Sequence, residues 1–174
     1  MDYEGLIRRH RKRLLADPGE LPVRLAEDSE AICRIIPHRP PFLLVDRLTG
    51  LDPAEAVICG VRGIDPEDPV FAGHFPGAPL YPGVLQVEML GQLGLCLHYF
   101  LTTGSRRIGR DAEPVQVRAT RIVGAHFLAP VEPGVEVTLL ARKLEADEFF
   151  ATMIGQVICD GTVSCVSVGE VVLV

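Results

Sequence analysis

The sequence predicts an α+β fold in which an antiparallel β-sheet wraps around one long central helix. Residues 84–101 form an apolar run that is hydrophobic on every side, and a helix of that kind has to be enclosed rather than laid on a surface. About six strand-like segments accompany it, several in succession with turn residues between them, as in an antiparallel meander. A length of 174 residues suits one substantial core and is short for two domains.

The chain is predicted to begin with a basic arm, residues 1–22, followed by the main domain at residues 23–174. Apolar pairs at residues 6–7 and 14–15 flank a basic run and favour a short helix, which Pro18-Gly19 ends. A solvated, partly flexible arm and a binding surface for an acidic partner both fit this pattern. The basic residues are Arg8, Arg9, Arg11, Lys12 and Arg13.

The other elements follow in order from local composition. A short helix is expected at residues 27–35, capped by Asp28 or Ser29 and broken by Pro37. A loop rich in Gly and Pro, residues 65–83, precedes the long helix, and Asp160-Gly161 predicts a tight hairpin between the last two strands. Strands are expected at residues 42–45, 56–61, 115–122, 135–144, 149–159 and 163–174.

Composition limits the classes of function. A net charge of −6 argues against nucleic acid as a partner. Five scattered cysteines without CxxC spacing favour reduced thiols, and no secretory signal is visible, so a cytoplasmic location is expected. Residues 84–101 are not expected to span a membrane, because Gln86, Glu88 and Gln92 interrupt the run. No pair of histidines has the spacing of metal ligands.

One histidine lies in a loop that could aim it at a substrate. His74 stands in Gly73-His74-Phe75-Pro76-Gly77, where proline stiffens the chain and glycine allows a substrate to approach the backbone closely. A structural histidine would fit the same pattern.

Glu88 is the only formally charged residue in the apolar run. A buried carboxylate without a partner is costly, so Glu88 is either a general acid or base or a structural carboxylate beside a polar spot. Gln92, one turn further on, could bind Glu88 or a ligand. Pro82-Gly83 starts the helix with Pro at the first helical position. The free N–H groups there suit a carbonyl that gains negative charge, although a plain helix start fits as well.

These groups together match one reaction type. Removing a proton α to a carbonyl requires a base, a donor for the developing enolate oxygen and an acid for the leaving group. His74, the Gly83 amide and Glu88 could supply these three roles, and the apolar helix could line an acyl tunnel.

Several linked motifs resemble the active-site block of the FabZ/FabA group of 3-hydroxyacyl-acyl-carrier-protein dehydratases. The resemblance covers residues 27–174, and the spacing of fourteen positions between His74 and Glu88 matches as well. Glu at position 88 is similar to the FabZ branch, since the FabA branch has Asp there. The matching segments are residues 73–77, Pro82-Gly83-Val84-Leu85 with Glu88 and Gln92, the run of residues 37–46, and residues 127–134.

The resemblance implies a hotdog fold without cofactor or metal. It also implies a homodimer or a trimer of dimers, in which each site takes the histidine from one chain and the acid from the other. His74 would then take the C2 proton, Glu88 would act on the β-hydroxyl, and the Gly83 N–H would hold the thioester carbonyl. The implied substrate is a 3-hydroxyacyl thioester carried by acyl carrier protein or CoA. The implied substrate-binding residues are Gly83, Gln92, Phe75, Val84 and Tyr81.

The sequence departs from the family pattern in places that bear on specificity. Pro40 and Tyr81 replace the usual Tyr and Met, and residues that are commonly basic near position 128 are absent. Arg106, Arg107 and Arg110 could dock an acidic carrier instead, or form a solvated loop. His38 is expected to have a packing role, and His98 to be a core or edge residue. A hotdog thioesterase and a non-catalytic acyl-binding protein are the alternative functions.

Overall fold

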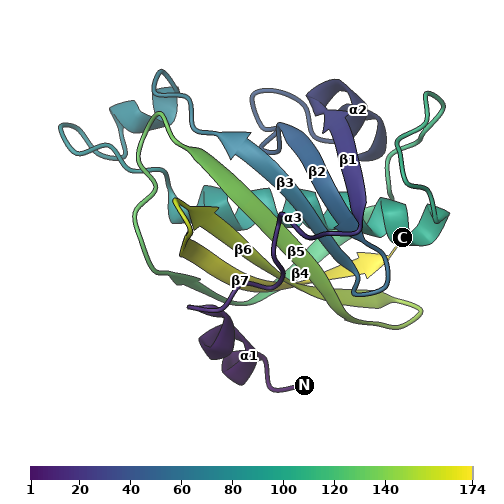
Figure 1. The fold of residues 1–174 in the computed structure, drawn as a ribbon. Coiled ribbons are helices and arrows are strands. Elements are labelled where there is room, and N and C mark those ends of the chain that lie inside the picture. The colour runs from purple at the N-terminus through teal and green to yellow at the C-terminus, as the bar shows by residue number, and fades with distance from the viewer. Residues whose placement is uncertain (174) are drawn as a thin grey trace.

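The computed structural model describes residues 1–173 and contains seven strands, three α-helices and one 3₁₀ helix (Figure 1). The elements in chain order are α1 (Tyr3–His10), β1 (Val23–Asp28), α2 (Ser29–Ile35), β2 (Arg47–Asp52), β3 (Val57–Gly63), η1 (Pro69–Ala72), α3 (Gly83–Thr103), β4 (Val117–Phe127), β5 (Glu136–Ala146), β6 (Phe150–Cys159) and β7 (Thr162–Leu173).

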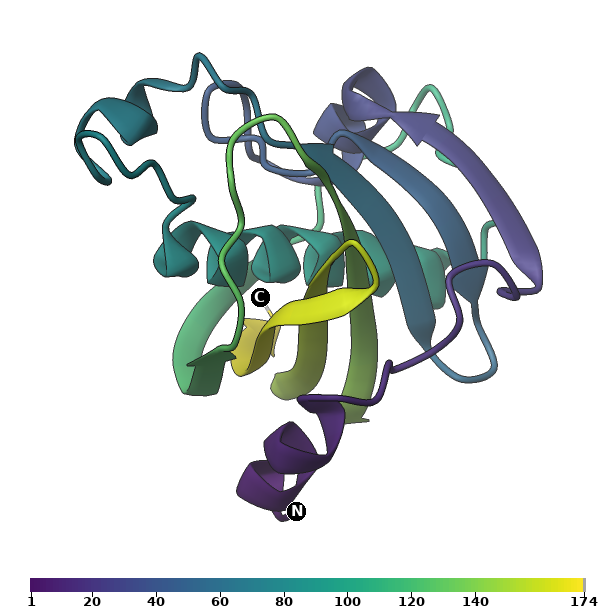
Figure 2. The same cartoon turned by 60° about the vertical axis from the view of Figure 1, so that its left-hand side comes forward.

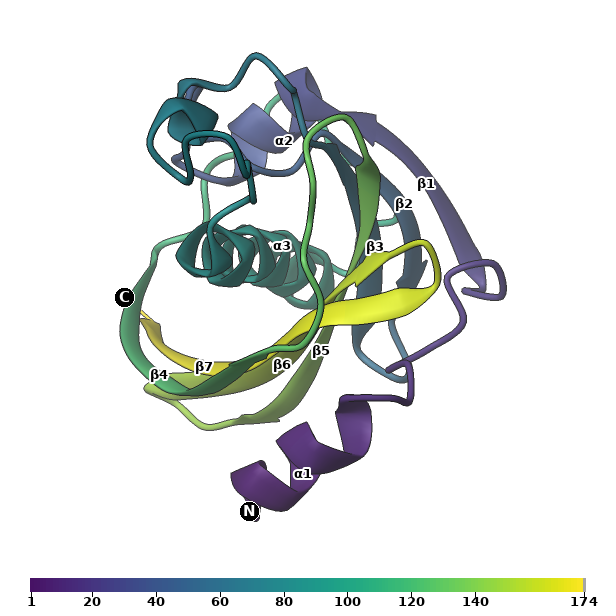
Figure 3. The ribbon, with the colours of Figure 1, turned by 90° about the vertical axis from the view of Figure 1, so that its left-hand side faces the viewer.

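The strands form a single antiparallel sheet in the order β1-β2-β3-β5-β6-β7-β4. The sheet curves around α3, which lies in its concave side, as Figures 2 and 3 show. The predicted class, a sheet wrapped around one long helix, is therefore confirmed. The helix is apolar enough and long enough to cross a membrane by composition alone, but here it is the core helix of the fold.

The core between α3 and the sheet explains why the helix is apolar all round. Met89, Leu93 and Cys96 are fully buried on α3 and belong to one cluster with Leu139 and Val157 of the sheet. Burial raises the pKa of the Cys96 thiol far above its ordinary value. Cys96 is therefore a packing residue, and all five cysteines are free thiols.

The predicted strand at residues 42–45 is wrong, because this segment is an extended loop. The side chain of Gln92 uses the backbone groups that a neighbouring strand would need. Its Oε1 accepts a hydrogen bond of 2.7 Å from the Leu44 N–H, and its Nε2 donates to the Phe42 carbonyl at 2.8 Å. The first two strands, β1 and β2, were not anticipated by the sequence pattern. Pro82 is the N-cap of α3 rather than its first helical residue.

Most other predicted elements agree with the structure to within a few residues. Asp28 caps α2 by accepting a hydrogen bond from the Ala31 N–H at 2.9 Å. Asp160 and Gly161 both have positive φ, 47° and 74°, as a type I′ hairpin turn requires. The predicted hairpin is therefore present between β6 and β7.

The N-terminal arm packs on the outer face of the sheet, opposite α3 (Figure 3). Ile7 and Leu15 are buried there with the outward-facing residues of β5, β6 and β7. The fully buried Gln156 holds the arm: it accepts a hydrogen bond from the Leu15 N–H and donates to the carbonyls of His10 and Arg13. Arg11, Lys12 and the other basic side chains of the arm remain exposed.

Candidate active site

The loop that follows η1 holds His74 in a defined orientation. The His74 carbonyl accepts a hydrogen bond from the Leu80 N–H at 2.9 Å, and its ring stacks on Phe75 with the centroids 4.0 Å apart. Nδ1 lies 2.8 Å from the carbonyl oxygen of Leu80. Because a carbonyl oxygen only accepts, Nδ1 carries the hydrogen and the neutral ring presents Nε2 with a free lone pair. That tautomer suits a general base.

His74 opens into a pocket of about 590 Å³ beside the start of α3. The pocket brings together His74, Gly83 and Phe127. A side chain at position 83 would collide with the Phe127 ring, since an added Cβ would lie 2.7 Å from it. Glycine is therefore required at position 83. Gly83 and Val84 line the pocket at the start of α3, where the first N–H groups of a helix are free and suit an oxygen that gains negative charge.

Three further predicted binding residues lie around this pocket in different ways. Val84 lines it and is 72% exposed, while Phe75 is half exposed beside His74. Tyr81 also lines it but is only 4% exposed, and its hydroxyl has no partner within residues 1–173. Burial raises the pKa of Tyr81 to about 12, so the phenol stays protonated.

Glu88 does not line the His74 pocket. Its Oε1 accepts a hydrogen bond of 2.9 Å from Gln92 Nε2. Because the Gln92 amide also binds Phe42 and Leu44, it orients Glu88 and the loop. Gln92 therefore contacts Glu88, one of the two alternatives that the sequence left open.

His38 contacts Glu88, which the sequence reasoning did not anticipate. It was expected to pack, yet its Nε2 lies 3.3 Å from Glu88 Oε1. The loop of residues 36–46, which Gln92 ties to α3, brings the imidazole there. The contact could have been expected only from the resemblance of this loop to the family pattern, because no spacing in the sequence connects His38 with Glu88.

The three arginines expected to dock a carrier lie at the other end of α3. Arg106, Arg107 and Arg110 are exposed in the loop after Thr103. A helix rises 1.5 Å per residue, so they are about 30 Å from Gly83 along the axis of α3. Within one chain they are remote from His74. No cluster of potential metal ligands occurs among the described residues.

Comparison with known proteins gives the site its context. Residues 36–166 match the family model described as the FabA-like domain. A 3-hydroxyacyl-acyl-carrier-protein dehydratase FabZ of Anaeromyxobacter sp. (strain Fw109-5) is 37% identical over 137 residues, which is 77% of this chain and 82% of that protein. The FabZ of Polynucleobacter necessarius subsp. necessarius (strain STIR1) is 36% identical over 148 residues, which is 81% of this chain and 93% of that protein.

The chain belongs to the FabZ-type dehydratase family. All the residues discussed above, from His38 to Phe127, lie inside the segment that matches the family model. The N-terminal arm, which Gln156 contacts, lies outside that segment.

Solved structures agree on the fold of this FabZ-type chain. The dehydratase heterocomplex ApeI:P from Xenorhabdus doucetiae matches with a TM-score of 0.61 and 17% identity, over 82% of this chain and 90% of that chain. A mutant thioesterase from Pseudomonas aeruginosa matches with a TM-score of 0.53 and 17% identity, over 72% of this chain and 78% of that chain. At such identities these likenesses show the fold alone, which is the hotdog fold.

Proposed function

We propose that this protein dehydrates a (3R)-3-hydroxyacyl thioester, bound to acyl carrier protein or CoA, to the trans-2-enoyl thioester in fatty-acid or polyketide-type biosynthesis. The observation that carries this proposal is the orientation of His74, whose Nδ1 faces the Leu80 carbonyl at 2.8 Å and leaves Nε2 free as a base. The FabZ relatives that match most of the chain support the same reaction.

Each step of the elimination has a group to perform it. His74 Nε2 takes the proton from C2, and the negative charge moves onto the thioester oxygen. The Gly83 N–H at the start of α3 stabilises that oxygen. Glu88 delivers a proton to the β-hydroxyl, so the C3–O bond breaks and water leaves. Gln92 holds the Glu88 carboxylate from one turn away.

A homodimer with shared sites is part of this proposal. In one chain, Glu88 does not line the pocket that contains His74. We therefore propose that one active site takes its base from one copy of the chain and its acid from the other. The sheet ends on β4, whose side chains are largely exposed, including Ile122 at 63%. An unpaired edge strand of this kind is a surface on which a second copy can add its own strand. A trimer of dimers is the larger assembly implied by the family.

Mixing two inactive variants tests the shared site. His74→Ala and Glu88→Gln should each lose activity by about 10²- to 10⁴-fold. Co-expressed in equal amounts, they should recover about a quarter of wild-type activity, because half of the dimers are mixed and each mixed dimer has one intact site. The control is a mixture of the two variants, purified separately and kept from exchanging subunits, which contains no mixed dimers and should stay inactive. No recovery in proven mixed dimers would contradict a site shared between chains.

The product distinguishes dehydration from the alternatives. Mass spectrometry should detect loss of water from 3-hydroxyacyl thioesters, without release of free thiol. Thiol release would indicate a thioesterase, which nothing in this structure favours beyond the shared fold. Binding without any product would indicate an acyl-binding protein.

We also propose that Arg106, Arg107 and Arg110 bind the acyl carrier protein. A cytoplasmic location is proposed as well. The three side chains are exposed and cationic, which suits an acidic carrier surface. Replacing all three by Ser should raise KM for carrier-bound substrate and leave KM for the CoA thioester unchanged. An equal change for both substrates would contradict carrier docking at these residues.

A further inference from the structure

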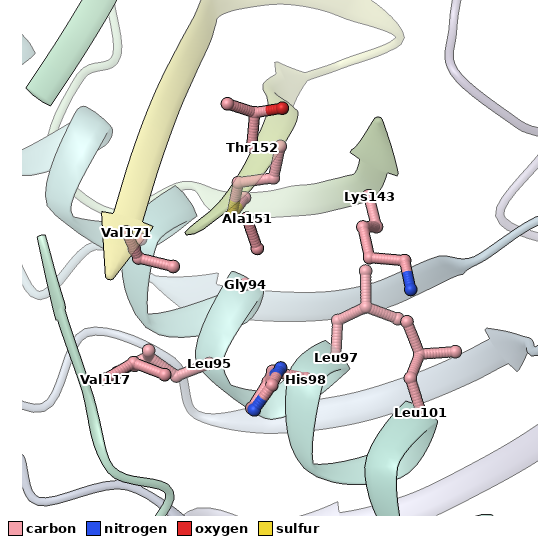
Figure 4. Close-up of a pocket in the computed structure, with 12 residues that line it drawn as sticks. Gly94, Leu95, Leu97, His98, Leu101, Val117, Lys143, Ala151, Thr152 and Val171 are labelled. Atoms are coloured by element: carbon pink, nitrogen blue, oxygen red, sulfur yellow. The ribbon is translucent and has the colours of Figure 1, made fainter. Parts of the chain in front are cut away.

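A second pocket lies between the C-terminal half of α3 and the strands β4 to β7. Its walls are largely apolar, and Figure 4 shows side chains from the helix and the sheet around it. The apolar lining comes from Leu95, Leu97, Leu101, Val117, Met153 and Val171.

This pocket shares a side of α3 with Glu88. Gly91 lines the pocket and lies three positions after Glu88, and residues three and four apart occupy one helix face. A Cβ added to Gly91 would meet nothing within 4 Å, so space is open beside the helix there. The open side of α3 therefore continues from Glu88 past Gly91 into the pocket.

Three polar side chains stand in the largely apolar lining: His98 on α3, Lys143 on β5 and Thr152 on β6 (Figure 4). Of these, His98 and Lys143 carry nitrogen donors. His98 is ten positions from Glu88, which is about 15 Å along the helix. No side-chain hydrogen bond of His98 occurs within residues 1–173. Burial and the charge of Lys143 lower the pKa of His98, so its ring is neutral near pH 7 and offers one N–H donor.

Lys143 breaks the pattern of its strand. Alternate residues of β5 face α3, and Val137, Leu139 and Ala141 do so as fully buried apolar side chains. Lys143 is the next residue in that row and lines the pocket. A cation at the end of an apolar row is unnecessary for packing against a helix, but it suits an oxygen at the end of a long ligand.

We propose that this pocket receives the far end of the substrate's acyl chain, and that His98 and Lys143 select chains carrying an oxygen there, as a hydroxyl or a carboxylate. The inference rests on the proposed dehydration, which places C3 of the substrate at Glu88. Lys143 is exposed at the mouth of the pocket and His98 is half-buried, so a plain alkyl end would remove water mainly from the imidazole without replacing its hydrogen bond, which is costly. An oxygen accepts from both groups.

Binding of substrate analogues tests the selectivity without requiring turnover. Acyl-CoA molecules of eight to fourteen carbons that lack the 3-hydroxyl are compared by calorimetry, with the far end a methyl, a hydroxyl or a carboxylate. The wild-type protein should bind an oxygen-ended chain about tenfold more tightly than the methyl-ended chain of equal length, as expected for one added hydrogen bond. Equal affinities at every length, or no binding of any analogue, would overturn the proposal.

Two variants and one control locate the selectivity. His98→Leu should abolish the preference for both oxygen-ended chains, and Lys143→Met should reduce it most for the carboxylate. Lys12→Met removes the only other lysine of the chain, which is exposed on the arm, and should leave the preference unchanged. A preference that persists in both pocket variants would overturn the assignment. Thermal melting establishes that each variant is folded.

A short substrate separates this inference from the proposed function. A 3-hydroxybutyryl thioester is too short to reach His98, so its dehydration reports on His74 and Glu88 alone. Turnover of this substrate without selectivity for long chains contradicts the inference and leaves the dehydratase intact. Selective binding without any turnover contradicts the dehydratase and leaves the chemistry of the pocket intact.

Discussion

His38 Nε2 lies 3.3 Å from Glu88 Oε1, at the side of α3 where the loop of residues 36–46 crosses the helix. The contact is an ion pair whenever the imidazole is protonated. Gln92 Nε2 approaches the same oxygen at 2.9 Å. One carboxylate oxygen of Glu88 is thus held from two sides, which leaves Oε2 available to the substrate.

Replacing His38 tests whether this contact serves catalysis. His38→Phe keeps a flat ring beside Phe42, whose centroid is 6.2 Å away, but removes Nε2. We expect kcat to fall by about tenfold, equivalent to about 1.4 kcal/mol of transition-state stabilisation, with KM and melting temperature nearly unchanged. If His38 only packs, as its sequence context suggested, steady-state kinetics will show no change in kcat.

Gln92→Leu should destabilise the protein as well as slow it. The Leu44 N–H and the Phe42 carbonyl would lose their buried partner, which costs about 2–4 kcal/mol for the pair. Urea unfolding measures this loss. Gln86→Leu is a matched control on the same helix, because within residues 1–173 the Gln86 side chain makes a single, long hydrogen bond of 3.5 Å to the Tyr81 carbonyl. Equal losses for the two variants would rule out a special role for Gln92.

Gly83→Ala should remove most activity by steric conflict. The new Cβ would lie 2.7 Å from the Phe127 ring, so either the ring or the start of α3 has to move. We expect a loss of about 10²-fold in kcat if the N–H groups shift away from the carbonyl oxygen. The double variant with Phe127→Leu provides more space and should recover part of the rate. An unaffected single variant would show that the position of the Gly83 amide is unimportant.

Gln156→Leu should release the arm. The change leaves the Leu15 N–H and the carbonyls of His10 and Arg13 without their buried partner, a cost of about 2–4 kcal/mol. Trypsin should then cleave faster after the exposed residues Arg11 and Lys12. Gln116→Leu, at an exposed position, serves as the control. Unchanged cleavage would mean that the apolar contacts alone hold the arm.

Stability should fall in mild acid because of His10. Burial, followed by the charges of Arg142 and Arg9, lowers the pKa of this histidine, although its hydrogen bond to Arg13 opposes the shift. The unfolded chain then binds a proton at a higher pH than the folded protein does. The stabilisation is therefore complete above about pH 6.5 and is lost as the pH falls below it.

Urea midpoints at several pH values measure this effect. Wild type should lose stability between about pH 7.5 and 5.5, and His10→Asn, which cannot titrate, should lose less. His126→Asn, at an exposed position, is the control and should follow the wild type. A His10→Asn curve that matches the wild type would assign the acid sensitivity to other groups.

The sequence predicted those features that depend on neighbouring residues. The Pro82-Gly83 helix start, the Asp160-Gly161 turn and the Asp28 cap are local, and all are present. The loop at residues 42–45 could not be predicted, because it is shaped by Gln92, almost fifty positions later. The contact between His38 and Glu88 depends on that same loop and was missed with it.

The strand β1 was missed for a different reason. Only Leu25 of its six residues is buried, and three of the others are exposed or partly exposed charged residues. An edge strand with one buried side chain lacks the alternation by which strands are recognised. The position of the arm could not be predicted either. The arm is held by Gln156, and no periodicity in the sequence connects Gln156 to residues 10–15.

Gly94 allows Met153 to lie directly against α3, since any Cβ at position 94 would overlap the Met153 sulfur. Met153 is unbranched and can adopt several shapes, so it can adjust to ligands of different widths where a branched residue could not. Protein engineers who wish to change the bulk of the chain that the proposed acyl pocket accepts can therefore begin with this one pair. A smaller residue at position 153 widens this pocket, and Gly94→Ala narrows it. Both changes leave the distant proton-transfer groups untouched.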